Sequence, residues 1–175
     1  MKKRKTDNKK SKGSPGYSVK KTVLLALFAA VLVGITAFIS LNFYQLMLIT
    51  GDSMLPSYHN MQFVILDRHT KSYTYGDVIA FRCDSVKTPL VKRIAACPGD
   101  SIVIKNKALY VNGEISAVFP DARFDYAGLL EETLTLGDGE YFAVGDNIAQ
   151  SKDCRYPEIG VIKSDSVSGV VAGNN

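Results

Sequence analysis

A run of twenty uncharged residues near the N-terminus limits most strongly what this chain can fold into. From Thr22 to Leu41 the sequence reads TVLLALFAAVLVGITAFISL. A helix rises 1.5 Å per residue, so this run spans about 30 Å, the thickness of the hydrocarbon core of a bilayer. It predicts a transmembrane helix over residues 22–43. A cleaved signal sequence, cut near Ala37 or Ser40, is the alternative, but its apolar region is only ~7–15 residues long.

The charges on the two sides of this run predict its orientation. Residues 1–21 contain nine Lys and Arg and one acid, Asp7, and so carry +8; because the whole chain carries +4, the remainder carries −4. The positive-inside rule places residues 1–21 in the cytoplasm as a basic tail and residues 44–175 outside the cell membrane. A basic arm can also bind nucleic acid, yet no binding module or interleaved aromatic residues accompany this one. We therefore expect the lipid bilayer, and no nucleic acid, as a partner.

Beyond the apolar run the sequence is typical of short β-strands. Seven segments are rich in β-branched and aromatic residues and are bounded by Gly, Asn, Asp or Pro. These expected strands are Gln62–Leu66, Asp77–Arg82, Leu90–Ala96, Ser101–Ile104, Ala108–Val111, Glu140–Val144 and Ser166–Val171. Asn106-Lys107 and Asn112-Gly113 indicate hairpin turns. We predict a mostly β fold, with one antiparallel or mixed β-sheet domain over residues 44–175, in which residues 114–137 form a small excursion.

Ser53 is the first candidate for a catalytic residue. The apolar run over residues 43–49 alternates with a period of two, which places Met47, Ile49, Gly51 and Ser53 on one face of a strand. A serine at the point where an extended segment breaks into a turn has a reachable hydroxyl, and a glycine two residues earlier leaves room for another backbone. This position suits a nucleophile. A Gly/Ser/Pro turn after an edge strand is the alternative.

Lys92 is the second candidate. Alternation along its strand places Lys92 on the face of Leu90 and Ile94, whereas Arg93 falls on the opposite face with Val91 and Ala95. An ordinary lysine, with a pKa of about 10.4, is protonated at neutral pH, but burial among apolar neighbours can lower the pKa to ~7–8. Lys92 therefore fits a general base. A lysine that extends its stem over apolar surface from a sheet edge is the alternative.

The cysteines and histidines offer a weaker alternative. Three cysteines, Cys83, Cys97 and Cys154, are too few and too unevenly spaced for a disulfide framework, and no Cys-x-x-Cys pair is present. Cys154 could act as a nucleophile with His59 or His69 as base, but both histidines lie in polar or turn segments expected at the surface. The sequence has neither His, Asp and Glu clusters at metal-ligand spacing nor a phosphate-binding glycine loop. We expect no metal and no cofactor.

A third stretch identifies a resemblance. GDNIAQSKDCR, Gly145 to Arg155, follows GDSMLPS at residues 51–57 and LVKRIAACPGD at residues 90–100. In this order the three resemble the sequence boxes of the type I signal peptidases, membrane-bound Ser/Lys proteases that remove signal peptides from exported preproteins. GDVIAF at residues 76–81 resembles a fourth box. The resemblance covers the chain from Met47 to Val171 in the family's order and spacing.

The resemblance implies a role for each matching residue. Ser53 matches the nucleophile, Lys92 the general base and Ser151 the hydroxyl that orients the lysine. The supporting residues are Asp153 and Arg155 as an ion pair, Arg93 as the basic residue after the lysine, and Gly145, Asp146 and Asn147 as the turn that shapes the site. Residues expected to bind substrate are Ile49, Met54, Leu90 and Val91 in the nearer pocket, Met47 and Ala80 in the farther one, and Gly51 beside the oxyanion.

Three positions depart from the family pattern. Ile148 stands where the family usually has arginine, and Cys154 where it usually has serine. Gly51 stands where Gram-negative relatives carry a serine that helps bind the oxyanion, and it resembles the Gram-positive form. Without that hydroxyl, the oxyanion relies on backbone N–H groups, including that of Ser53.

The implied substrates are signal peptides with small residues, such as alanine, one and three positions before the cut, bound as an added strand. Two other functions remain open. Relatives encoded with pilus genes that have lost the catalytic residues act as assembly chaperones, and a membrane-tethered binding protein with an incidental Ser and Lys is the third possibility. The presence of both Ser53 and Lys92 favours the protease.

Overall fold

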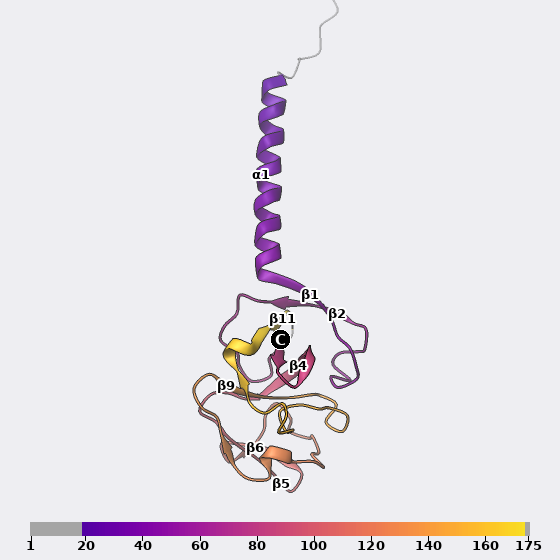
Figure 1. Cartoon of the computed structure of the whole chain (residues 1–175), viewed down its shortest axis with the longest axis vertical. Coiled ribbons are helices and arrows are strands. Elements are labelled where there is room, and N and C mark those ends of the chain that lie inside the picture. Colours follow the sequence, from indigo (N-terminus) through magenta and orange to yellow (C-terminus); the bar gives the residue numbers. More distant parts are fainter. Residues whose placement is uncertain (1–18, 174–175) are drawn as a thin grey trace, which may run out of the picture. The chain divides into compact units, whose positions relative to one another are not determined.

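The apolar run forms helix α1, Val19–Phe43, in a computed structural model that describes residues 19–173 (Figure 1). The helix begins three residues before the predicted boundary at residue 22, because lysines are good helix formers and continue its first turn. In the part of the chain described, α1 is the one helix long and apolar enough to cross a membrane. Most of the predicted basic tail, residues 1–18, lies outside the described residues.

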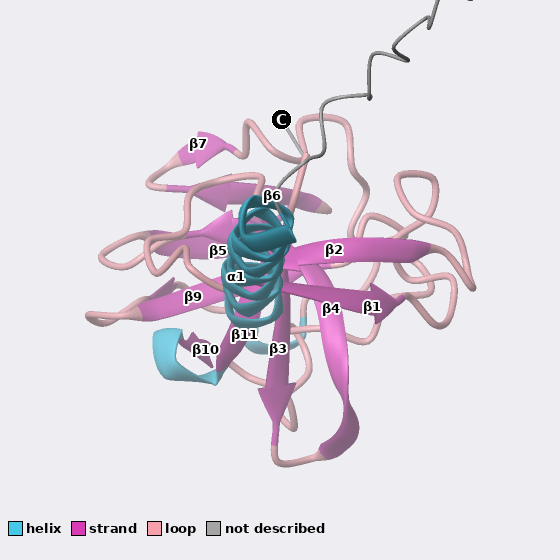
Figure 2. Ribbon diagram, turned by 90° about the horizontal axis from the view of Figure 1, so that it is seen from above, coloured by secondary structure: helices cyan, strands magenta, loops and turns pink. Residues whose placement is uncertain are grey.

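The residues after the helix form a β domain of two antiparallel sheets (Figure 2). The larger sheet has the order β1 (Tyr44–Leu48), β2 (Phe63–Asp67), β11 (Val167–Val171), β3 (Val78–Cys83), β4 (Val86–Ala96), β9 (Glu140–Val144) and β10 (Ile162–Lys163). The smaller sheet has the order β7 (Glu114–Ile115), β6 (Ala108–Val111), β5 (Ser101–Lys105) and β8 (Leu134–Thr135). Two short 3-10 turns, η1 (Gly128–Leu130) and η2 (Ser164–Ser166), complete the domain.

The predicted mostly β fold is confirmed. Six of the seven predicted strands both begin and end within one residue of their expected bounds. The exception is β4, which begins at Val86 rather than Leu90. Both predicted hairpin turns are present: Asn106, Lys107 and Asn112 have positive φ angles of 50°, 65° and 53°. The strands β7, β8 and β10 have two residues each, too few to show a period in the sequence.

Residues 114–137, expected as a small excursion, contain β7, η1 and β8. Four apolar side chains of this segment, those of Phe119, Phe124, Leu130 and Leu136, are buried in the larger of two hydrophobic cores. Packing, rather than a period in the sequence, therefore fixes the conformation of this segment.

Strands β3 and β4 contribute side chains to both hydrophobic cores, since alternate residues of a strand face opposite sides. Ile79 and Ile94 belong to the larger core, whereas Val91 belongs to the smaller one. Lys92 pairs directly with Ile79 across the two strands and is buried. Ala95 was expected to face the same side as Val91, but it lies in the larger core because the β4–β9 pairing is irregular between Ile94 and Ala96.

Candidate active site

Ser53 lies in a turn between β1 and β2, beyond the end of the strand at Leu48. The period-two alternation predicted through Ser53 therefore ends early, and Gly51, at φ +88°, adopts the left-handed conformation that glycine favours. The Gly51 N–H donates to Asn60 Oδ1 at 2.9 Å. Met54, 1% exposed, anchors the turn in the smaller core. The buried side chain of Met54 thus holds in place the turn that carries the Ser53 hydroxyl.

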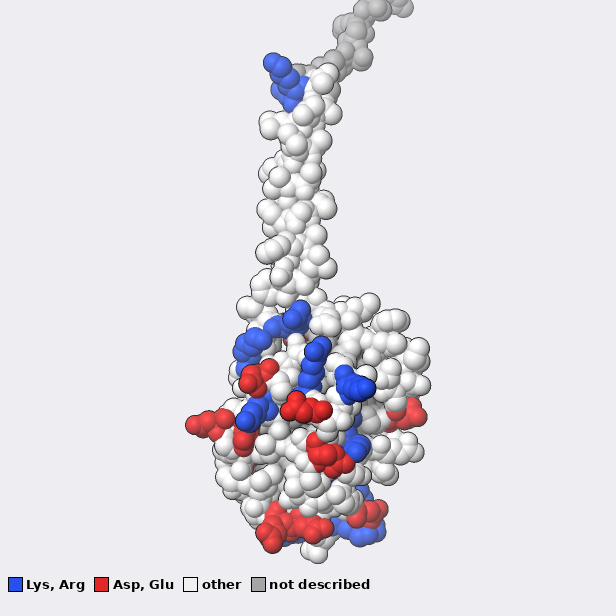
Figure 3. Space-filling view, in the orientation of Figure 1, with Lys and Arg blue, Asp and Glu red and all other residues white. Residues whose placement is uncertain are grey.

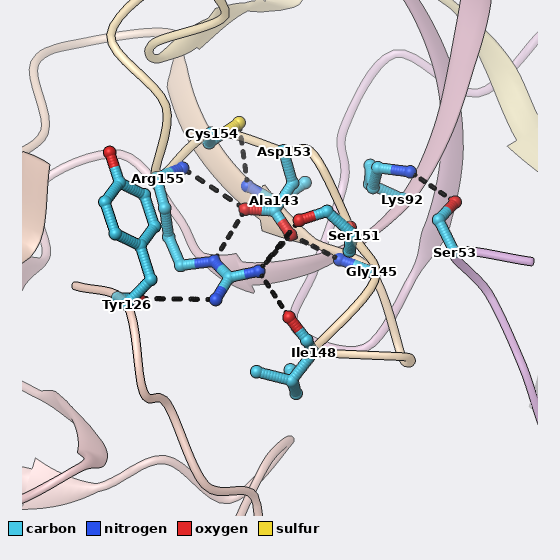
Figure 4. A network of polar contacts seen from close by, with 10 residues as sticks. All are labelled: Ser53, Lys92, Tyr126, Ala143, Gly145, Ile148, Ser151, Asp153, Cys154 and Arg155. Atoms are coloured by element: carbon cyan, nitrogen blue, oxygen red, sulfur yellow. Dashed lines mark hydrogen bonds and ion pairs between the residues drawn. The ribbon is translucent and has the colours of Figure 1, made fainter. Parts of the chain in front are cut away.

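The Lys92 amine lies 2.6 Å from Ser53 Oγ, within hydrogen-bond distance (Figure 4). The lysine side chain reaches it from β4, and Lys92 is 2% exposed. Burial lowers the pKa of this amine below its usual value, and outweighs the opposing effect of the Asp153 carboxylate, which favours the charged form. A neutral amine can accept the proton of the serine hydroxyl. The pair can therefore act as nucleophile and general base.

A buried ion pair holds the loop after β9. Asp153 and Arg155 are 0% and 2% exposed, and Arg155 Nε donates to Asp153 Oδ1 at 2.8 Å. Arg155 Nη2 donates to Asp153 Oδ2 and to the carbonyls of Ile148 and Ser151 at 2.9, 2.9 and 3.1 Å. The Gly145 N–H donates to the same carboxylate at 3.1 Å. One charged pair therefore fixes both ends of the loop beside Lys92 (Figure 4).

Asn147 joins this loop to the Ser53 turn. Its backbone N–H donates to the Ser53 carbonyl and its side-chain Nδ2 donates to the Asp52 carbonyl, both at 3.0 Å. Ser151, expected to orient the lysine, is buried in the same loop, but its hydroxyl has no hydrogen-bond partner among residues 19–173. The loop therefore positions the Ser53 turn through one backbone and one side-chain hydrogen bond from Asn147.

Replacing Gly145 with alanine should reduce activity at least a hundredfold. A Cβ at this position would overlap the Ser53 carbonyl oxygen and Ser151 Oγ, and the first of these is backbone that cannot rotate away. The nucleophile would then move relative to Lys92, and small displacements of a reacting group have large effects on rate. The kcat/KM of the variant on a preprotein measures the effect, with Gly34→Ala in helix α1, where an added Cβ meets nothing within 4 Å, as the matched control. Wild-type activity of Gly145→Ala would contradict this geometry.

Arg93 makes a second ion pair on the other side of β4. Its Nε and Nη2 donate to the two Asp146 oxygens at 2.8 and 2.7 Å, and its Nη1 donates to the Gly76 carbonyl at 2.8 Å. Because Asp146 lies between Gly145 and Asn147, this pair ties β4 to the loop that holds the Ser53 turn. Two planar groups joined by parallel hydrogen bonds have a fixed relative orientation.

A small cleft of about 100 Å³ adjoins Ser53 and Lys92. Five of the residues expected to bind substrate line it, namely Met47, Ile49, Met54, Leu90 and Val91. Ala80 does not line it; the residue is 0% exposed and lies in the smaller core. Gly51 is exposed and lies outside the lining. A larger cavity of about 630 Å³ lies next to Arg93 and is lined by neither Ser53 nor Lys92.

The remaining candidate residues either pack in the larger core or lie at the surface. Cys154 is fully buried, its sulfur accepts the Ala143 N–H at 3.4 Å, and burial raises its pKa. A buried thiol with a raised pKa is a poor nucleophile. His59 and His69 are exposed, as expected for surface histidines. Ile148 packs its side chain against the larger core. Residues 19–173 contain no group of His, Cys, Asp and Glu that could hold a metal ion.

Sequence reasoning missed two parts of the site. Thr88 and Pro89 line the cleft because β4 begins four residues earlier than predicted. A proline inside a strand indicates an edge without a hydrogen-bonded neighbour, and this signal was available in the sequence. Asn60, which holds Gly51 in place, had no such signal.

Comparisons with known proteins show the family of this chain. The family model described as "Signal peptidase, peptidase S26" matches residues 19–173. Signal peptidase I S of Bacillus subtilis (strain 168) is 32% identical over 155 residues, which cover 81% of this chain and 83% of the relative. Signal peptidase I U of the same strain is 32% identical over 142 residues, 75% of each chain. A crystal structure of signal peptidase I from Enterococcus faecalis V583 is 25% identical, with a TM-score of 0.45 over 58% of this chain and 97% of that one.

The family match spans the helix and the whole β domain, and the relatives are matched over most of their own length. The apolar helix α1 provides the membrane anchor that such an enzyme needs. The chain therefore belongs to the signal peptidase S26 family and is a membrane-anchored, serine-type signal peptidase.

Proposed function

We propose that the chain cleaves signal peptides from exported preproteins with Ser53 as nucleophile and Lys92 as general base. The observation that carries this proposal is the distance of 2.6 Å between the Lys92 amine and Ser53 Oγ, together with a lysine that is 2% exposed. The contact between Lys92 Nζ and Ser53 Oγ gives the hydroxyl proton a direct path to the amine. Burial supplies the neutral amine that accepts it.

The reaction follows from these two groups. Lys92 takes the hydroxyl proton as Ser53 Oγ attacks the carbonyl carbon of the scissile peptide bond. Backbone N–H groups, including that of Ser53, stabilise the oxyanion, because Gly51 offers no hydroxyl. Protonated Lys92 then gives its proton to the leaving amine, and water hydrolyses the acyl-enzyme with the same lysine as base.

The substrate lies extended in the cleft beside β4. Strand β4 pairs with β3 along one edge, and on its other edge it pairs with β9 only from Arg93 onward. Residues 86–92 therefore have no strand partner on that second edge among the described residues. An extended peptide can add to such an edge through main-chain hydrogen bonds. A cleft of about 100 Å³ favours small side chains next to the cut. We therefore propose cleavage after small residues of the Ala-X-Ala type.

Digestion of a preprotein by the full-length protein in detergent tests this function. We expect one cleaved bond, identified by mass spectrometry, directly after an Ala-X-Ala sequence. A preprotein with phenylalanine in place of the alanine before the cut should be cleaved at least a hundredfold more slowly, because the cleft cannot hold the ring. Intact preprotein after prolonged digestion would favour the non-cleaving chaperone, and equal cleavage of both preproteins would contradict the small-residue cleft.

We further propose that the N-terminus lies in the cytoplasm and the β domain outside the cell membrane. The nine basic residues within residues 1–21 support this orientation. Protease added to intact protoplasts should degrade the β domain and spare an epitope placed at the N-terminus. Protection of the β domain would contradict the orientation.

A further inference from the structure

A polar pocket of about 460 Å³ lies beside the first residues of the β domain, away from the cleft at Ser53 and Lys92. Asn42 and Gln45 line one part of it, and Arg68, Lys71 and Arg82 contribute three cations. Its other lining residues are Asp165, Ser166, Val167 and Ser168. We call it the Arg68–Arg82 pocket.

The three cations of this pocket are not neutralised. Within residues 19–173 no ion pair involves Arg68, Lys71 or Arg82, and Asp165 is the one acid in the lining. Elsewhere on the surface, Lys107 and Lys152 each have a carboxylate within 2.7 Å. Lys and Arg side chains gather over the end of the domain where Figure 1 labels β1 and β11 (Figure 3). The pocket thus carries a net charge of +2 that attracts an anion.

The chain connectivity links this pocket to the end of the apolar run. The apolar run ends at Leu41, so Asn42 and Gln45 lie one and four residues beyond it in the chain. Arg68 lies next to this point of the chain, because its N–H donates to the carbonyl of Phe43, the last residue of α1, at 2.8 Å. The last turn of α1 contains no basic residue. The cations close to this end of the apolar run in the described chain therefore include those of the pocket.

We propose that the Arg68–Arg82 pocket binds the phosphate of an anionic phospholipid headgroup. Guanidinium groups and ammonium groups bind phosphate oxygens by charge-assisted hydrogen bonds. A zwitterionic headgroup brings its own cation into a pocket that already has three, which disfavours it. The pocket therefore selects anionic lipids and fixes the β domain at the surface of an anionic leaflet.

Titration of the full-length protein in detergent micelles tests this proposal, with bound lipid counted by native mass spectrometry. The probes are dihexanoyl phosphatidylglycerol, dihexanoyl phosphatidylcholine and inorganic phosphate. We expect phosphatidylglycerol to bind at least tenfold more tightly than either of the other two. Replacing Arg68, Lys71 and Arg82 together by Gln should remove this preference.

Two further variants separate the pocket from general charge and from misfolding. Asp165→Asn removes the one acid of the lining and should tighten phosphatidylglycerol binding severalfold, a gain that damage to the fold cannot produce. Replacing Lys105, Lys107 and Arg123 by Gln removes three exposed cations outside the pocket and should leave the affinity unchanged.

Three results would overturn the proposal. Equal affinity for the two lipids would show that the headgroup charge is not recognised, and equal losses in the two triple variants would show that only total charge matters. Inorganic phosphate binding as tightly as phosphatidylglycerol would show a site for the free ion instead of the lipid. None of these outcomes depends on cleavage, so the proposal can fail while the proposed peptidase mechanism holds.

Discussion

Replacing Ser53 or Lys92 with alanine is expected to abolish preprotein cleavage, with a loss on the order of 10⁴-fold or more for each. The two side chains are in contact at 2.6 Å and act as one unit, so removing either should cost as much as removing both. The kcat/KM of the full-length variants on one preprotein measures the loss. Wild-type circular dichroism would show that the β domain remains folded.

Lys92→Met and Cys154→Ser are the matched controls. Methionine keeps much of the apolar stem of Lys92 and fills the same space. Loss of activity in the Lys92→Met variant would therefore reflect the missing amine and not a cavity. Serine at position 154 can accept the Ala143 N–H that the thiol accepts now, and the variant should stay active. Active Ser53→Ala together with inactive Cys154→Ser would show that the nucleophile is misassigned.

Replacing Arg155 with alanine is expected to destabilise the β domain by about 3–5 kcal/mol, the usual effect of removing one partner of a buried ion pair. Asp153 would remain fully buried with only the N–H groups of Gly145 and Arg155 (now alanine) as partners. The carbonyls of Ile148 and Ser151 would lose the guanidinium donor as well. Activity should fall with stability, because this loop positions the Ser53 turn.

Urea unfolding of the full-length protein in detergent, followed by circular dichroism, measures this effect. Lys107→Ala removes a cation from the exposed pair Lys107–Asp125 and should leave the unfolding midpoint unchanged, since solvent screens that pair. An Arg155→Ala midpoint equal to the wild-type midpoint would show that the buried pair does not hold the loop.

The strands could be predicted because β-branched residues, turn residues and burial agree along the chain. The prediction failed at the start of β4: the expected strand began at Leu90, but β4 runs from Val86 through Pro89, because no neighbouring strand on that edge needs an N–H from the proline. The alternation through Ser53 ended early because Gly51 turns the backbone. Local patterns therefore predicted most strand bounds, but missed the start of β4 and the turn at Gly51, which depend on edge pairing and backbone conformation.

The candidate site was predicted from the order of four motifs, while its geometry required the structure. Ser53 and Lys92 lie 39 residues apart, and no local period shows that their side chains meet. The family resemblance implied that Ser151 orients the lysine, but the structure shows its hydroxyl without a partner among the described residues. The Arg68–Arg82 pocket had no sequence signal, because its cations come from segments brought together by the pairing of β2, β11 and β3.

The pH dependence of kcat/KM tests most directly whether Lys92 is the base. Burial lowers the pKa of Lys92, so the neutral, base-competent fraction should rise at a lower pH than in an ordinary lysine, whose pKa is ~10.4. The ascending limb of kcat/KM reports this ionisation in the free enzyme. We expect the limb in the neutral to mildly alkaline range, an inactive Lys92→Arg, and a limb shifted toward ~6.5 for any residual activity of Lys92→His. A wild-type limb that rises only near pH 10, or full activity of Lys92→Arg, would show that another residue is the base.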